Sequence, residues 1–152
     1  MKTEEFKKLL FRSAVSMMAV DGEIHEDEIN EIKSIANSTA YFIDFEVDKE
    51  LAENVSEIKQ NGKDSINGLL NLLEKQDLNP SQETILIDVL IRMIEADKRI
   101  DDNELQFLHL VKSKLKATVE DLVAKFPKKV SYLVDIGNYG TTKTFDKDIN
   151  IK

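Results

Sequence analysis

The stretch MMAVDGEIHEDEINEIKSI (residues 17–35) joins two apolar patterns through a short acidic corner. Before the corner, apolar residues recur at three- and four-residue spacings over residues 6–20, which predicts an amphipathic helix. Asp21-Gly22 ends this helix, because glycine readily adopts the left-handed conformation found after helix C-termini. Isoleucines then recur at helical spacing to residue 35. The stretch therefore predicts a helix, a tight acidic corner and a second helix.

A second stretch, MIEADKRIDDNELQFLHLV (residues 93–111), repeats this pattern 76 residues later. Both stretches share the frame D-x-x-I-x-x-x-E across the corner, which is more than two amphipathic helices need in common. The identical aligned residues are Met17 and Met93, Asp21 and Asp97, Ile24 and Ile100, and Glu28 and Glu104. The repeat predicts two similar helical hairpins, one in each half of the chain.

Capping and stop signals divide the rest of the chain into further helices. Asp44 or Asp48 can cap a third helix that ends near Asn61-Gly62. The stretch NPSQ (residues 79–82) offers an Asn N-cap, a proline at the first helical position and a Gln placed for a capping box. After a fourth helix that opens at Asp64 and Ser65, the fifth helix follows NPSQ and is apolar almost all round, which indicates a central, buried position.

The C-terminal part of the chain changes character. Thr118–Asp121 opens a short seventh helix, which Pro127 ends. Beyond it, β-branched residues, aromatic residues and two glycines interrupt the helical period. We therefore predict an all-α, single-domain bundle of about seven helices over residues 3–127, followed by a non-helical or partly extended tail over residues 128–152.

Composition narrows the classes of partner and compartment. The 152 residues include 29 acidic and 21 basic side chains, so the net charge of −8 makes nucleic acid a poor partner. The absence of cysteine excludes disulfides and thiolate chemistry. The N-terminal sequence MKTEEFKK has acids where a signal peptide needs an apolar core, so we expect a cytoplasmic protein.

AVDGEIHEDEI (residues 19–29) and EADKRIDDNEL (residues 95–105) resemble the paired A-D-G-x-I-x-x-x-E motifs of the TerB family and its TerB-like relatives. These relatives include the N-terminal domain of certain membrane-anchored J-domain co-chaperones. The resemblance implies an all-helical fold in two similar halves, and an association with bacterial stress resistance, including tellurite resistance, and with membrane-associated assemblies. One departure is that Lys98 and Arg99 replace the Gly and the following residue of the first motif.

The same resemblance implies a divalent-metal site, for which Ca²⁺ or Mg²⁺ suits carboxylate ligands. Its ligands would be Asp21, Glu28, Asp97 and Glu104. His25 would add a nitrogen beside these acids. The corner is not an EF-hand, because the first and third loop positions would fall on residues 17 and 19, which have no side-chain oxygen.

The corner acids also have a purely structural interpretation. Glu28 and Glu104 fall three residues into their helices, where a carboxylate reaches back to a free backbone N–H. Asp101 has the spacing of an N-cap, and Asp21 and Asp97 can bond amides of their own turns. Metal ligands and helix caps therefore both remain open for the same residues.

Lysines are concentrated near the end of the helical part and predict a basic patch. The patch could face an acidic partner or an anionic membrane, or be an ordinary solvated surface. Its residues are Lys112, Lys116, Lys125, Lys128 and Lys129.

The sequence favours a non-enzymatic binding or scaffold module with one or more protein partners. His25 and His109 do not align in the repeat, so no nucleophile–base pair is evident. A metal-dependent enzyme that uses carboxylate ligands is the alternative, and would need a deep pocket around Asp21 and Asp97.

Overall fold

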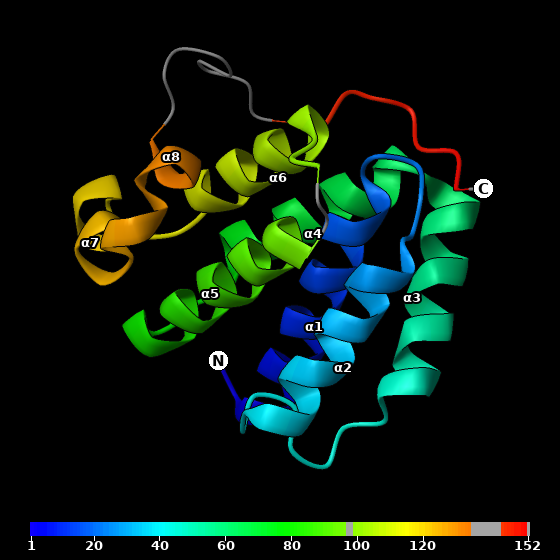
Figure 1. The fold of residues 1–152 in the computed structure, drawn as a ribbon, viewed down its shortest axis with the longest axis horizontal. Coiled ribbons are helices and arrows are strands. Elements are labelled where there is room, and N and C mark those ends of the chain that lie inside the picture. The colour runs from blue at the N-terminus through cyan, green and yellow to red at the C-terminus, as the bar shows by residue number, and fades with distance from the viewer. Residues whose placement is uncertain (97–98, 135–143, 152) are drawn as a thin grey trace.

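The protein is a single bundle of α-helices. The computed structural model describes residues 1–96, 99–134 and 144–151, and these contain α-helices, one short 3₁₀ helix and no strand (Figure 1). The elements are α1 (Thr3–Ala19), α2 (Glu26–Ser38), α3 (Val47–Asn61), α4 (Lys63–Lys75), α5 (Pro80–Ala96), α6 (Asp102–Ser113), α7 (Val119–Lys125), η1 (Pro127–Lys129) and α8 (Val130–Leu133). The predicted all-α, single-domain fold is confirmed.

Helices α1 and α5 form the centre of the bundle. They pack against each other, α3, α4 and α6 also contact α1, and α2 and α6 also contact α5. Both central helices are buried on several sides, as the nearly continuous apolar sequence of α5 predicts. On α1, the buried Ser13 hydroxyl donates to the Leu9 carbonyl over 2.8 Å.

The two repeated stretches contribute α1 and α2, and α5 and α6, and each second helix packs on the first helix of the other stretch. Helix α2 follows α1 in the chain but packs on α5, and α6 follows α5 but packs on α1 as well. This exchange brings the connection after α1 and the start of α6 to the same end of the bundle (Figure 1). The packing thus places the first acidic corner beside the second.

Local capping signals mark the helix starts well. Asn79 and Gln82 form a reciprocal capping box, with hydrogen bonds of 3.0 and 2.8 Å, and α5 begins at Pro80 as predicted. Thr118 and Asp121 form the same box at the start of α7, with bonds of 3.1 Å. These starts depend on residues within one turn, which is why the sequence alone shows them.

The predicted cap of the third helix was wrong. Helix α3 begins at Val47 after Glu46, and neither Asp44 nor Asp48 caps it. Asp44 instead takes a positive φ of 59° in the preceding turn, a conformation that Asp tolerates better than most residues. This turn is packed by a cluster of phenylalanines, in which Phe11 lies 5.6 Å from Phe42 between ring centroids.

The predicted start of the non-helical tail at residue 128 was too early. Helical structure continues through η1 and α8 to Leu133, which is fully buried. Residues 144–151 form no helix or strand, and run over the end of the bundle where the two corners lie (Figure 1).

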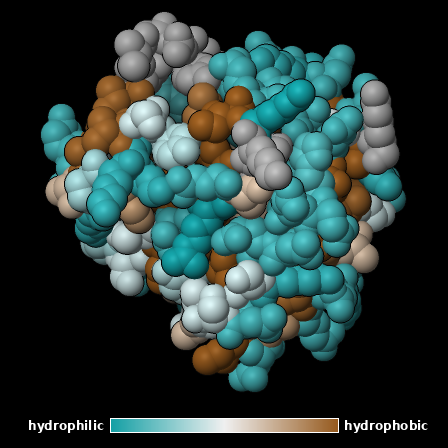
Figure 2. All heavy atoms as spheres, viewed as in Figure 1, coloured by the Kyte–Doolittle hydropathy of each residue, from teal (hydrophilic) through white to brown (hydrophobic). Residues whose placement is uncertain are grey.

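One face of the molecule is mostly polar. On the face shown in Figure 2, hydrophilic residues dominate and apolar groups form separate small areas. None of the helices within the described parts of the chain is long and apolar enough to cross a bilayer.

Candidate functional site at the paired acidic corners

The first corner is held by the side chain of Asp21. Its Oδ1 atom accepts a hydrogen bond from the Glu23 N–H over 3.0 Å, which closes a tight turn. Gly22 lies inside this turn with φ of +87°, and its N–H donates to the Ala19 carbonyl over 3.0 Å. The aspartate and the glycine thus end α1 in the way the D-G pair predicts.

Glu28 is part of the same corner but lies inside the protein. Only 1% of the residue is exposed, and its Oε1 accepts a hydrogen bond from the His25 N–H over 3.2 Å. Because His25 is the residue that precedes α2, this bond satisfies a backbone donor that has no partner within the helix. The predicted capping contact of Glu28 is confirmed.

The second corner also places an aspartate at a helix start and a glutamate inside the protein. Asp101 is the N-cap of α6, and its Oδ1 accepts from the Asn103 N–H over 2.7 Å. Glu104, which aligns with Glu28, is fully buried. Asp97 and Lys98 lie outside the described residues.

The two corners are bonded to each other. The side-chain Nδ2 of Asn103 donates to the backbone carbonyl of Val20 over 3.1 Å, which joins the first turn of α6 to the end of α1. Asp101 is also close enough to Asp21 for its negative charge to raise the pKa of that carboxyl group. The corners therefore form one unit, defined here as the paired corner: residues 20–28 and 101–104.

The electrostatics of the paired corner centre on Asp21, whose side chain is 12% exposed. Burial raises the pKa of Asp21, the hydrogen bond from Glu23 N–H and the nearby His25 lower it, and the net direction is upward. His25 Nε2 lies 3.4 Å from Asp21 Oδ2 and 3.7 Å from Glu23 Oε2. The folded protein therefore disfavours the charged form of Asp21.

The corner carboxylates that the structure places do not fit a metal site by themselves. Asp21, Glu28 and Asp101 each use one oxygen to accept a backbone N–H. Across residues 1–96, 99–134 and 144–151, no three His, Asp or Glu side chains come together in a way that could hold an ion. The predicted four-carboxylate site includes Asp97, which is not among these residues, so that site stays a prediction.

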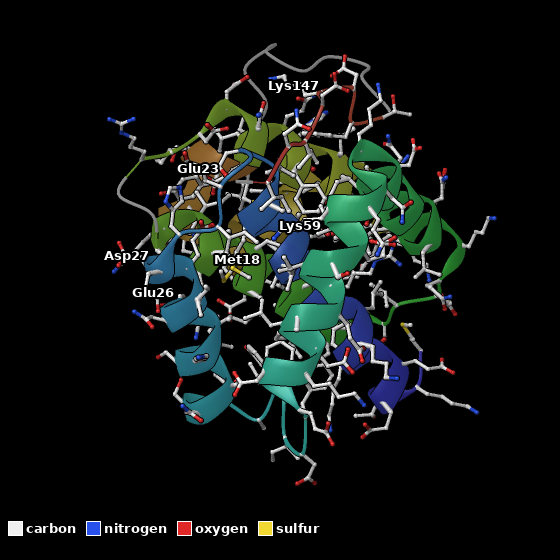
Figure 3. All side chains as sticks on the ribbon, turned by 90° about the vertical axis from the view of Figure 1, so that its right-hand side faces the viewer. Met18, Glu23, Glu26, Asp27, Lys59 and Lys147 are labelled. Atoms are coloured by element: carbon white, nitrogen blue, oxygen red, sulfur yellow. The ribbon has the colours of Figure 1, made fainter. Side chains whose placement is uncertain are left out.

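Three acids of the first corner face outward instead. The Glu23 side chain is 57% exposed, and Glu26 and Asp27 in the first turn of α2 are exposed too. Figure 3 shows Glu26 and Asp27 at the outer edge of the bundle, whereas Met18 points into it. These three acids are called the acidic rim below.

The predicted basic patch is not one free cationic surface. Lys112 is buried and its Nζ donates to the Leu133 carbonyl, so its prediction as a partner- or membrane-facing residue was wrong. Lys116 pairs with Asp77, Lys125 donates to Thr84 Oγ1 over 2.8 Å, and Lys129 lies 2.5 Å from Glu95. Lys128 is exposed.

The family comparison agrees with this architecture. A family model described as tellurite resistance protein TerB matches residues 10–125. The chain belongs to the TerB family. The matched region contains the described paired corner and runs from α1 into α7, while residues 144–151 lie outside it. No curated protein and no solved structure gave a significant match.

Sequence reasoning missed Asn103, although this residue joins the two corners of the TerB domain. Its position two residues after the Asp101 N-cap gave a local signal for a capped helix start. The acceptor, Val20, lies 83 residues earlier and is apolar, so no sequence pattern indicates the bond.

Proposed function

We propose that this TerB-family chain is a non-catalytic binding module, which acts as a scaffold in a stress-response assembly of the kind associated with the family. The partner that fits the acidic rim is a protein with a basic surface. The observation that carries this proposal is a difference among the acids of the first corner. Asp21 and Glu28 accept hydrogen bonds from backbone N–H groups of the corner, whereas Glu23, Glu26 and Asp27 face solvent.

The charge of the chain supports the same role. A net charge of −8 steers cationic partners toward the molecule, and an exposed group of acids at one end gives that attraction a direction. The lysines near α6 and α7 do not offer an equal cationic surface, because several of them contact acids or carbonyls of the chain itself.

The arrangement offers little support for the alternative of a carboxylate enzyme. A recess of about 480 Å³ lies against α5 and α7, and its lining includes Glu83, Lys116 and Lys125 but no residue of either corner. Glu83 is already bonded there, since its Oε2 accepts from the Lys116 N–H over 2.7 Å. A catalytic carboxylate needs a substrate cavity beside it, which this recess does not give to Asp21.

Affinity capture from the native cells tests the proposal. The bait is the full chain with Glu23→Gln, Glu26→Gln and Asp27→Asn, compared with the unchanged chain by quantitative mass spectrometry. The rim variant should lose at least tenfold of the partner that the unchanged chain retains, and higher salt should weaken the unchanged complex, because exposed charges are screened.

A matched variant controls for net charge. Asp44→Asn, Asp48→Asn and Glu53→Gln also remove three negative charges, from exposed positions on and before α3. The start of α3 lies at the opposite end of the bundle from the paired corner (Figure 1). This control should retain the partner. Equal retention by both variants, or equal loss, would contradict a role for the rim.

A divalent ion at the paired corner is the second candidate. It is favoured by the partly buried Asp21, whose carboxyl group lies near enough to Asp101 for their charges to interact. A cation between such groups would relieve their repulsion. The unfolding experiment at the end of the Discussion separates this candidate from the structural role of the acids.

A further inference from the structure

Residues 144–151, called the strap below, are bonded to the bundle in an unusual way. Asn67 on α4 donates from Nδ2 to the Phe145 carbonyl over 2.8 Å, and its Oδ1 accepts from the Phe145 N–H over 2.8 Å. One amide side chain therefore bonds both backbone groups of one strap residue. Every residue except proline carries these two groups, so this contact recognises extended backbone rather than a particular side chain.

Two apolar side chains anchor the strap on either side of its exposed charges. Phe145 is 1% exposed and Ile149 is 8% exposed, and both belong to the hydrophobic core. The three residues between them are exposed. The pattern is one aromatic anchor, three solvated positions and one aliphatic anchor.

Two glycines at positive φ lie against the strap backbone. A Cβ atom on Gly22 would lie 3.3 Å from the Asn150 carbonyl oxygen, and one on Gly62 would lie 3.7 Å from the Ile149 carbonyl oxygen. Gly22 is the corner glycine and Gly62 ends α3, so the strap lies across the ends of two helices.

The charged residues of the strap contact charged residues of opposite sign. Lys147 Nζ lies 3.5 Å from Asp102 Oδ2, and Lys63 Nζ lies 3.8 Å from Asp148 Oδ1. Figure 3 shows Lys147 at the same end of the bundle as Glu23. Both pairs are well exposed, so they orient the strap more than they hold it.

We propose that the surface under the strap, formed by Gly22, Gly62, Lys63, Asn67 and Asp102, is a binding site for an extended polypeptide segment of a partner protein. The strap occupies this site as an internal ligand. A competing segment needs an aromatic residue, an aliphatic residue four positions later and a basic residue between them, which matches the strap itself. This inference deepens the proposed binding role, and its site residues are other than the three acids of the acidic rim.

The position of the strap in the chain supports this inference. The site residues lie within the region matched by the TerB family model, whereas the strap lies beyond its end. A segment tethered to its own site competes at an effective concentration of about 1 mM, so a partner segment binds well only when it outcompetes or displaces the strap. The strap thus sets a threshold for partner binding.

A fluorescent peptide with the strap sequence TFDKDINI tests the site directly. In the full chain, Phe145→Ser with Ile149→Ser removes both anchors and should release the strap while leaving the site residues unchanged. The released chain should bind the peptide at least tenfold more tightly than the unchanged chain. Adding Asn67→Ala to the released chain should weaken binding about tenfold, since two hydrogen bonds are lost. A peptide with its phenylalanine changed to alanine should bind poorly.

Failure of the released, folded chain to bind the peptide would overturn the proposal. Equal peptide affinity with and without Asn67→Ala would also overturn it. Circular dichroism checks that the released chain is folded. A second measurement needs no destabilising change: the chain has no cysteine, so Asp146→Cys provides one spin-label position on the exposed side of the strap. Millimolar peptide should make this label more mobile, and an unchanged spectrum would also overturn the proposal. Neither measurement involves the acidic rim, so their failure would leave the capture experiment intact.

Discussion

The Asn103 side chain donates a hydrogen bond to the backbone carbonyl of Val20 over 3.1 Å. These residues are 83 positions apart, and the bond connects the start of α6 with the end of α1. Asp21 also bonds within its own turn and Asp101 caps the start of α6, so the paired corner is bonded both locally and between its two parts. Asp21 and Asp101 thus hold the backbone of the two corners in place, and Asn103 joins one corner to the other.

Removal of this link should destabilise the protein. Asn103→Ala leaves the carbonyl of Val20, a residue that is 1% exposed, without this donor, so we expect a loss of about 1–3 kcal/mol in the free energy of unfolding. Asn54→Ala is the matched control, because its amide donates to the Glu50 carbonyl of its own helix α3, and should cost less than about 0.5 kcal/mol. Urea unfolding of the two variants measures both values, and equal losses would argue against the link.

Asp21→Asn should stabilise the protein at neutral pH. The folded state raises the pKa of Asp21 above its ordinary 3.8, chiefly by burial, so the charged form is disfavoured in the fold. Asparagine keeps an Oδ1 acceptor for the Glu23 N–H and removes the charge.

The pH dependence of this effect has a definite sign. Between pH 3.8 and the folded pKa, the native state binds more protons at Asp21 than the unfolded state does, so its stability falls as pH rises through this window. The advantage of Asp21→Asn should therefore be full above the folded pKa and shrink as pH falls toward 3.8. Urea midpoints at pH 7, 5 and 4 measure it, and an advantage that grows on acidification would contradict this account.

Two glycines should respond to alanine in opposite directions. Gly22→Ala places a Cβ at φ of +87° and 3.3 Å from the Asn150 carbonyl, which should cost about 1–2 kcal/mol. Gly68→Ala lies within α4, and its Cβ would make only an ordinary contact of 3.6 Å with Arg12, so it should stabilise by about 0.5–1 kcal/mol. Thermal unfolding of the pair checks this, and a stabilising Gly22→Ala would refute the geometry of the corner and strap.

The cap of α5 gives a prediction away from the site. Asn79→Ala removes one half of the capping box with Gln82 and should cost about 1 kcal/mol. Asn79→Ser retains a good N-cap and should stay within about 0.5 kcal/mol of the unchanged chain. Equal denaturation midpoints for the two variants would show that the box contributes nothing measurable.

The sequence predicted local features of this fold and missed those that depend on distant contacts. The Asn79–Gln82 and Thr118–Asp121 boxes lie within one helical turn, so their residue types alone predict helix starts. The contact of the strap with α4 could not be predicted, because Asn67 and Phe145 are 78 residues apart. Neither residue type by itself indicates such a contact. The helical structure of α8 was not predicted, because a helix of four residues has too few positions to show a periodic apolar pattern.

The candidate site divides in the same way. The caps formed by Asp101 and Glu28 followed from their positions relative to the helix starts. The burial of Lys112 did not, because its acceptor is the carbonyl of Leu133 on another helix. Likewise, the ion pairs of Lys116 with Asp77 and of Lys129 with Glu95 could not be predicted, because the fold brings these acids from distant positions in the chain.

The central claim is that the acids inside the paired corner serve the fold, while the acidic rim serves a partner. The most direct test is thermal unfolding of chelator-treated protein with and without millimolar Ca²⁺, Mg²⁺ or Mn²⁺, for the unchanged chain and for Asp21→Asn. An ion present at a hundred times its dissociation constant would add about 2.7 kcal/mol. For a chain of 152 residues, that would raise the midpoint by roughly 5–11 °C. The account predicts no such rise in either protein. A rise of that size in the unchanged chain that Asp21→Asn abolishes would contradict it and make the paired corner a metal site.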